Sequence, residues 1–209
     1  KVVKVEGMDG AGLRHVNAST IRSTALPGVQ GNFFTADLDA VRQAFESVPW
    51  VRQAAVRREW PDKLIVAVEE HRALGAWGSD GKLLSVKGEV FTANLAEAEE
   101  DGPLPVFGGP EGSAKEVVAR YAELHQWLEP AGLVPESVAL SERYGWTVKL
   151  TNGMKVELGR EQARASVKER AERLAGIYPQ LASRLQDRIE TVDMRYPNGL
   201  ALTAQGLKL

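Results

Sequence analysis

The chain has 209 residues, which is comfortable for two small domains, and its 44% apolar and 26% charged residues are typical of a soluble globular chain. A net charge of −2 gives no support to nucleic-acid binding, which usually requires a basic balance or a basic face. The absence of cysteine excludes disulfides, thiolate zinc sites and cysteine nucleophiles.

Residues 1 to about 70 are predicted to form one β-α-α-β-β unit. After a first strand at Val2–Glu6, Asn17 is placed to cap one helix and Thr35 a second, with Asp37 in the first turn of the second helix, where the helix dipole favours negative charge. The two closing strands are expected at residues 51–60 and 63–69, joined by a turn at Pro61-Asp62.

From about residue 71 to 209 short strands and turns dominate, which predicts a β-rich second domain with a mainly antiparallel sheet and flanking helices. The acidic cluster at residues 97–101 reads as a solvated loop, since it lacks the spacing of a calcium-binding loop. Ser113 and Glu116 have the spacing of a capping box at the start of a helix. The overall fold class is therefore α+β.

Residues 146–158 form the clearest predicted hairpin. A three-residue loop, Thr151-Asn152-Gly153, pairs Leu150 with Met154, Val148 with Val156 and Trp146 with Leu158, and so keeps every apolar side chain on one face. Such a loop requires positive φ at Gly153.

A helix is expected at residues 163–177, ended by Pro179, with a solvated basic face that carries Arg164, Lys168, Arg170 and Arg173. The chain then closes with strands at 189–196 and 200–203, joined by the turn Tyr196-Pro197-Asn198-Gly199.

The sequence contains no set of reactive side chains with the spacing of a catalytic or metal site. The three histidines lack metal-ligand spacing, and Ser79-Asp80-Gly81-Lys82 fits the pattern S-x-x-K only within a hairpin turn, where the lysine cannot return to the serine hydroxyl. Glu69 and Glu70 are neighbours on a strand and point to opposite faces. We therefore expect no catalytic activity, cofactor or metal.

Two binding surfaces are suggested instead. Arg52, Arg57 and Arg58 with Trp60 are a possible contact surface of the first domain, the alternative being solvated arginines with Trp60 in the core. The last strand, which includes Leu202, has neither charge nor proline, so an edge left unpaired there can accept a partner strand. The alternative is an edge that is covered by a loop or solvated.

Several separated motifs, in order along nearly the whole chain, resemble the FtsQ/DivIB family of bacterial cell-division proteins. Residues 31–77 contain Pro-Trp-Val, then Arg, Trp-Pro-Asp-Lys-Leu, Glu and a later Trp, and residues 104–117 read LPVFGGPEGSAKEV. LGRE, YPQL and VDMRYPNG follow. Ala73 and Ser85 depart from the family pattern, which affects local turn geometry only.

The resemblance implies a POTRA domain at 1–70 and an FtsQ-type partner-binding domain at 71–209. It implies a non-catalytic scaffold of the divisome that links early and late division proteins at the septum. A transmembrane helix ahead of Lys1 would anchor the chain in the inner membrane, with the covered region in the periplasm of a Gram-negative cell.

The same resemblance implies that the second domain binds the FtsB–FtsL pair and that POTRA serves other division proteins. By the match of MRYPNG, the partner-binding residues are Arg195, Tyr196, Asn198, Gly199 and Leu200, with Arg143 before Trp146 as an addition. The alternative is a POTRA-containing protein of outer-membrane assembly or secretion, whose membrane barrel would need more strands than follow residue 70.

Overall fold

The structure is a computed structural model that describes residues 2–185 and 188–206. It divides into two compact units. One contains the described residues up to Ala73 together with Phe91–Pro103, and the other contains Leu74–Val90 and the described residues from Leu104 onward. No helix in the described ranges is long and apolar enough to cross a bilayer.

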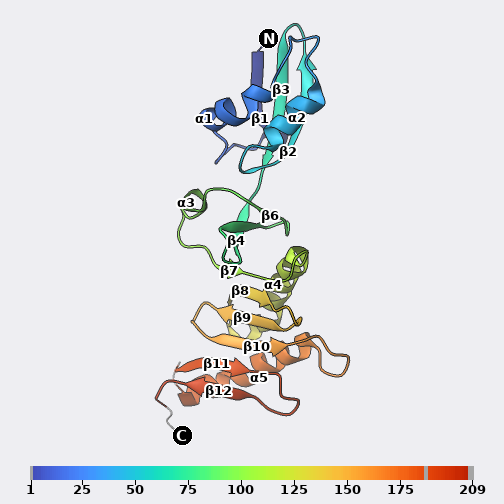
Figure 1. Ribbon diagram of the computed structural model, residues 1–209. Helices are drawn as coiled ribbons and strands as arrows, with labels where there is room; N and C mark the ends of the chain where they lie inside the picture. The colour runs from blue at the N-terminus through green and yellow to red at the C-terminus, as the bar shows by residue number, and fades with distance from the viewer. Residues whose placement is uncertain (1, 186–187, 207–209) are drawn as a thin grey trace. The chain divides into compact units, whose positions relative to one another are not determined.

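The first unit has the expected β-α-α-β-β order around a three-stranded sheet (Figure 1). The sheet order is β1-β3-β2, with β1 parallel and β2 antiparallel to the central strand. The elements are β1 (Val2–Gly7), α1 (Ala18–Thr20, followed by a π turn to Ala25 and a 3-10 turn to Gly28), α2 (Leu38–Glu46), β2 (Val51–Glu59) and β3 (Lys63–Glu70).

Of the two helix N-caps predicted in the first domain, one is confirmed. Asn17 accepts a hydrogen bond from the Thr20 N–H at 2.9 Å, as expected. The second helix is capped by Asp37, whose Oδ1 accepts from Asp39 N at 2.9 Å, so the prediction for Thr35 is wrong. Asp37 directly precedes the first helical residue and brings a carboxylate to the positive end of the helix dipole.

The acidic segment at 97–101 belongs to the first unit, and its interpretation as solvated is confirmed for the exposed Glu99, Glu100 and Asp101 but is wrong for Glu97, which lies in α3 (Leu95–Ala98) and is half-buried. The buried Trp50 donates its indole N–H to Glu97 Oε2 at 2.8 Å and packs edge-on against Phe91 at 5.4 Å. Asp101 forms an ion pair with Arg14.

The second unit is built on two sheets, ordered β6-β5-β4-β7 and β12-β11-β10-β9-β8 (Figure 1). In the five-stranded sheet only the β10–β11 pair is parallel. The smaller sheet comprises β4 (Ala73–Trp77), β5 (Lys82–Ser85), β6 (Val90–Phe91) and β7 (Val106–Phe107), whereas α3 (Leu95–Ala98) belongs to the first unit. The larger comprises α4 (Ala114–Leu128), β8 (Pro135–Leu140), β9 (Trp146–Leu150), β10 (Lys155–Gly159), α5 (Val167–Leu185), β11 (Ile189–Asp193) and β12 (Ala201–Ala204).

Helices α4 and α5 bury one face of the five-stranded sheet. Alternate residues of β9 and β10, such as Val148 and Val156, contribute to one core with Val117 and Leu124 of α4 and Leu174 of α5. The opposite face carries polar side chains. Strand β8, which has no clear signal in the sequence, extends this sheet beyond β9.

The predicted three-residue hairpin loop is confirmed. Gly153 has φ +89°, Leu150 N donates to Met154 O at 2.9 Å, and Val148 faces Val156. The expected pairing of Trp146 with Leu158 is wrong, because a bulge places Gly159 opposite Trp146. The bulge leaves the Leu158 side chain buried while it shifts the backbone register.

Two expectations about helix ends are also wrong. Ser113 precedes α4, but its hydroxyl donates to Pro110 O at 2.6 Å and makes no cap bond. Helix α5 continues past Pro179 to Leu185. Its second half packs Tyr178, Leu181 and Leu185 against the core, and this burial outweighs the backbone hydrogen bond that proline removes.

We expect Gly153→Ala to lower the free energy of unfolding by about 1–2 kcal/mol, because alanine is disfavoured at positive φ. No heavy atom lies within 4 Å of the added Cβ, so the effect isolates backbone conformation. Gly176→Ala, on the exposed face of α5, is the matched control and should stabilise by roughly 0.5–1 kcal/mol. If urea unfolding showed that both variants change the free energy of unfolding in the same direction, the positive φ assigned to Gly153 would be contradicted.

Candidate partner-binding edge

Strand β12 is an edge strand of the five-stranded sheet, as the sequence predicted for the last strand. It pairs with β11, and within residues 2–185 and 188–206 no strand pairs with its outer side. The strand begins at Ala201, so Leu200 lies just before it and packs partly buried against the core. The opposite edge strand, β8, is partly covered, since Leu140 N donates to Gly108 O at 2.9 Å.

The composition of β12 sets it apart from the other edge strands. Sheet edges are usually protected from pairing by charge or proline. Among the described edge strands with four or more residues, β1 carries Lys4 and Glu6, β2 carries several arginines, and β8 begins at Pro135 and carries Glu136. Strand β12 reads Ala-Leu-Thr-Ala and carries none of these protections.

Half of the N–H groups of β12 face away from β11. The N–H of Gln205, which follows the strand, donates to Arg188 O at 2.9 Å. Because N–H direction alternates along a strand, Thr203 and Ala201 point toward β11, and Leu202 and Ala204 point outward. The Leu202 donor is therefore available to an added strand.

The turn that precedes β12 is exposed and is held from beneath by α5. Tyr196, Asn198 and Gly199 are exposed. Arg173 of α5 donates to Pro197 O at 2.7 Å, Tyr196 O at 2.8 Å, Met194 O at 3.1 Å and Gly199 O at 3.4 Å. The interpretation of Arg173 as part of a solvated helix face is thus wrong, because its guanidinium organises the backbone of the turn.

Arg170, one turn earlier on α5, was expected to be solvated and is buried. It donates to Leu158 O at 2.7 Å and Arg160 O at 2.6 Å, which fixes the bulged end of β10. At that end Gly159 has φ +73°, and a Cβ there would lie 2.9 Å from Arg195 Cγ. The absence of a side chain at Gly159 therefore makes room for the stem of Arg195.

Arg195 is already paired within the chain. Its Nε lies 2.9 Å from Asp193 Oδ1 and its NH2 group lies 2.6 Å from Oδ2, a bidentate arrangement. These hydrogen bonds hold the pKa of the Asp193 carboxyl below its usual value. A partner carboxylate would have to compete with Asp193 or bind on the remaining face of the guanidinium.

Arg143 lies on the exposed turn between β8 and β9. Since β9 is antiparallel to β10 and β10 is parallel to β11, this turn and the one at 195–199 lie at the same end of the sheet. Three strand spacings separate their midpoints, or roughly 14 Å. An elongated partner that follows this end can contact both.

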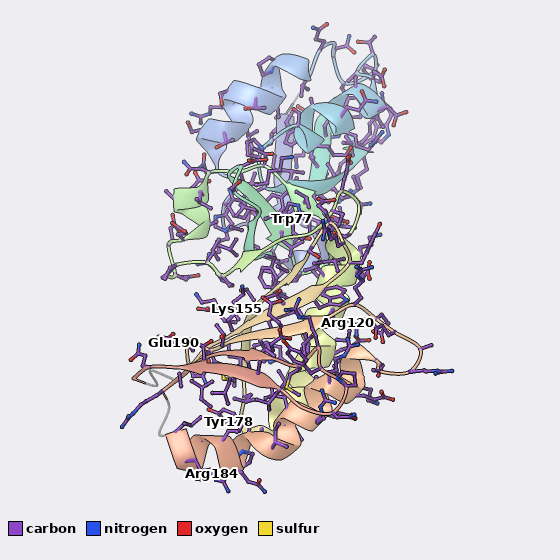
Figure 2. The ribbon with its side chains drawn as sticks, turned by 60° about the horizontal axis from the view of Figure 1, so that its bottom comes forward. Trp77, Arg120, Lys155, Tyr178, Arg184 and Glu190 are labelled. Atoms are coloured by element: carbon purple, nitrogen blue, oxygen red, sulfur yellow. The ribbon has the colours of Figure 1, made fainter. Side chains whose placement is uncertain are left out.

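An open depression of about 310 Å³ adjoins the edge on the polar face of the sheet. Lys155, which points away from the helices in Figure 2, and Glu157 form an ion pair at 3.0 Å on its floor. Thr203 of β12 belongs to the lining, so the depression can receive side chains of a segment bound at the edge.

The structure does not bring the three arginines of β2 together as one free surface. Arg52 pairs with Glu69 at 3.0 Å, and Arg58 donates to Phe33 O at 3.0 Å and Ala36 O at 2.7 Å. Arg57 is exposed beside Glu59. Trp60 is 72% exposed, so the alternative that placed it in the core is wrong.

Comparison with known proteins agrees with this architecture. Residues 11–71 match the family model described as POTRA domain, FtsQ-type, and residues 75–195 match Cell division protein FtsQ/DivIB, C-terminal. The chain is 53% identical to Cell division protein FtsQ of Burkholderia pseudomallei, over 93% of this chain and 76% of that protein. It is 41% identical to the FtsQ proteins of Bordetella pertussis and Nitrosospira multiformis, over 96% of this chain and 77% and 81% of those proteins.

The fold is that of an N-terminal POTRA domain followed by a β-rich region with mixed sheets and flanking helices. With both family models and these relatives in agreement, the chain belongs to the FtsQ/DivIB family of cell-division proteins.

We expect Arg173→Ala to loosen the turn at 194–199 and to lower the free energy of unfolding by about 1–3 kcal/mol, since several carbonyls lose a charged donor. Amide hydrogen exchange should accelerate at residues 194–200 and stay unchanged in the β9–β10 hairpin. Arg184→Ala, in the exposed last turn of α5 (Figure 2), is the control. Unchanged exchange at the turn would show that Arg173 does not organise it.

We also expect the Asp193 carboxyl to titrate below about 3.9, the ordinary aspartate value, when followed by NMR. A lowered pKa means that the pair stabilises the fold above the ordinary value and that this stability is lost as pH falls through the lowered one. Arg195→Ala should move the Asp193 midpoint upward, and Arg143→Ala should not. An unchanged midpoint in Arg195→Ala would contradict the pairing.

Proposed function

We propose that this protein is a non-catalytic scaffold of the bacterial divisome that binds the FtsB–FtsL pair through β12 and the turn before it. The proposal is carried by one observation: β12 is an edge strand without charge or proline, and its outer side is unpaired within the described part of the chain. Membership of a cell-division family supplies the setting.

Strand addition fits the geometry of this edge. A partner segment extended along β12 can accept a hydrogen bond from the outward Leu202 N–H and place alternate side chains over the depression at Thr203. Tyr196 is half exposed beside the strand and offers aromatic area together with a hydroxyl. Asn198, Gly199 and Leu200 shape the entry to the strand.

Charge adds selectivity at the same end of the sheet. Arg195 and Arg143 are exposed there, and guanidinium groups suit bidentate pairing with carboxylates. An acidic partner segment would thus be aligned along the end of the sheet while its extended part pairs with β12.

The first domain has a separate role in the proposal. The FtsQ-type POTRA domain recruits or is recruited by other division proteins, with exposed Arg57 the most available of the contact arginines, beside Arg52 and Arg58. The protein is anchored in the inner membrane by one transmembrane helix ahead of Lys1, faces the periplasm, and concentrates at the septum during division.

The alternative, a POTRA-containing protein of outer-membrane assembly or secretion, is less well supported. Both halves of the chain match FtsQ-type families, and the second half matches one named for cell division.

The test is binding of a periplasmic FtsB segment, with FtsL, to variants of the β12 edge. Tyr196→Ala and Leu202→Pro should each weaken binding tenfold or more, about 1.4 kcal/mol, because the first removes an aromatic contact and the second an outward backbone donor. Leu202→Ala retains the N–H and is the matched control, so it should bind more tightly than Leu202→Pro.

Circular dichroism must show that each variant is folded. If folded Tyr196→Ala and Leu202→Pro bind FtsB as tightly as the parent, the site is not at this edge.

A further inference from the structure

Two aromatic side chains of the first domain are exposed to an unusual degree. Trp60 is 72% and Phe34 is 68% exposed, the highest values among the large hydrophobic side chains that the structure describes. They lie edge-on to each other, with ring centroids 5.7 Å apart, and both contact Phe33, which is buried. Phe34 and Trp60 are called the aromatic pair below.

The aromatic pair is held in place by its surroundings. The guanidinium of Arg58 donates to the carbonyls of Phe33 and Phe34 at 3.0 and 3.4 Å. Asn32 Oδ1 accepts from the N–H of Phe34 at 2.8 Å and of Thr35 at 3.0 Å. These hydrogen bonds hold the backbone of the loop that carries Phe34, and exposed apolar patches rimmed by polar residues mark interaction sites.

The aromatic pair lies at the end of the domain where β1 starts. Val2 pairs with Lys63 across the sheet, and its N–H donates to Asp62 O at 3.0 Å, two residues beyond Trp60. Val2 is itself half exposed. The point at which the chain enters the first domain and the aromatic pair thus share one end of the β-sheet.

The charged side chains around the aromatic pair are engaged within the domain, Arg58 with backbone carbonyls and the others in ion pairs. Arg57 lies 3.6 Å from Glu59 and 3.9 Å from Glu6, and Lys63 lies 3.9 Å from Glu59. This surface is therefore not a basic patch, and a ligand that depends on negative charge is not favoured.

We propose that Phe34 and Trp60 form a membrane-contact site that rests in the interfacial region of a phospholipid bilayer. This inference rests on the anchor ahead of Lys1 in the proposed function, because that anchor brings the Val2 end of the domain to the bilayer. Tryptophan is enriched at membrane interfaces, where its ring is accommodated among the headgroups and its N–H remains hydrated. The contact is apolar and does not require anionic lipid.

The test tethers the whole chain to a bilayer at its start, independently of the native anchor. The protein has no cysteine, so Lys1→Cys supplies a unique thiol for a maleimide lipid in phosphatidylcholine nanodiscs. All five tryptophans carry 5-fluorotryptophan, and the Trp60 resonance is assigned from its absence in Trp60→Phe. A phospholipid with a nitroxide near its headgroup then broadens resonances close to the membrane.

We expect loss of the Trp60 resonance in the tethered protein, with Trp50, which precedes β2 at the opposite end of the same strand, as the internal control that persists. Phe34→Ser should restore the Trp60 resonance, and Tyr144→Ser, at an exposed aromatic of the second unit, should leave it broadened. Added salt or anionic phosphatidylglycerol should change none of these results.

Equal broadening of the Trp50 and Trp60 resonances, or no broadening of the Trp60 resonance, would overturn the proposal. So would a Trp60 resonance that is affected only when a protein partner is added, because the aromatic pair would then be a protein-binding site. The experiment contains no FtsB and uses a synthetic tether, so its failure is distinct from failure of the β12 site.

Discussion

The candidate edge depends on two guanidinium groups that one helix holds against strand ends. Arg170 and Arg173 are three residues apart on α5 and so lie on the same side of the helix. Arg170 binds the carbonyls at the end of β10, and Arg173 binds those of the turn between β11 and β12. Charged donors to buried or half-buried carbonyls are among the stronger hydrogen bonds in proteins, so α5 fixes both the bulge and the turn.

In this arrangement, the residues that hold the turn in place are different from the exposed residues that the proposal assigns to partner contact. The exposed groups of the edge, above all the Tyr196 side chain and the outward N–H of Leu202, are not part of the buried core. The hydrogen bonds from Arg170 and Arg173 hold the backbone beneath them. Substitution of an exposed group should thus alter binding with little loss of stability, and substitution of Arg173 should alter both. The Asp193–Arg195 pair combines the two properties, because it orders on the surface an arginine that the proposal assigns to partner contact.

Sequence patterns predicted most of the architecture because the spacing of apolar residues indicates which face of a strand or helix is buried. Alternation in the β9–β10 hairpin identified its loop and its common face, and the composition of β12 identified an unprotected edge. The end of α5 was missed because Pro179 is a local signal, whereas the packing of Leu181 and Leu185 is a tertiary one. Arg170 and Arg173 were missed because an arginine that binds distant carbonyls looks, in sequence, like any arginine on a helix face.

The parallel pairing of β10 with β11 has a consequence for synthesis. Parallel neighbours require a crossover, here through α5, so β11 can join the sheet only after that helix has been made and packed. Strand β12 pairs only with β11 in the described sheet, so the β12 edge is the last part of the sheet to be assembled as the chain leaves the ribosome. A chain whose synthesis stops before residue 200 lacks β12 and ends its sheet at β11, so a partner that binds at β12, as proposed, would distinguish molecules in which this sheet has been fully assembled.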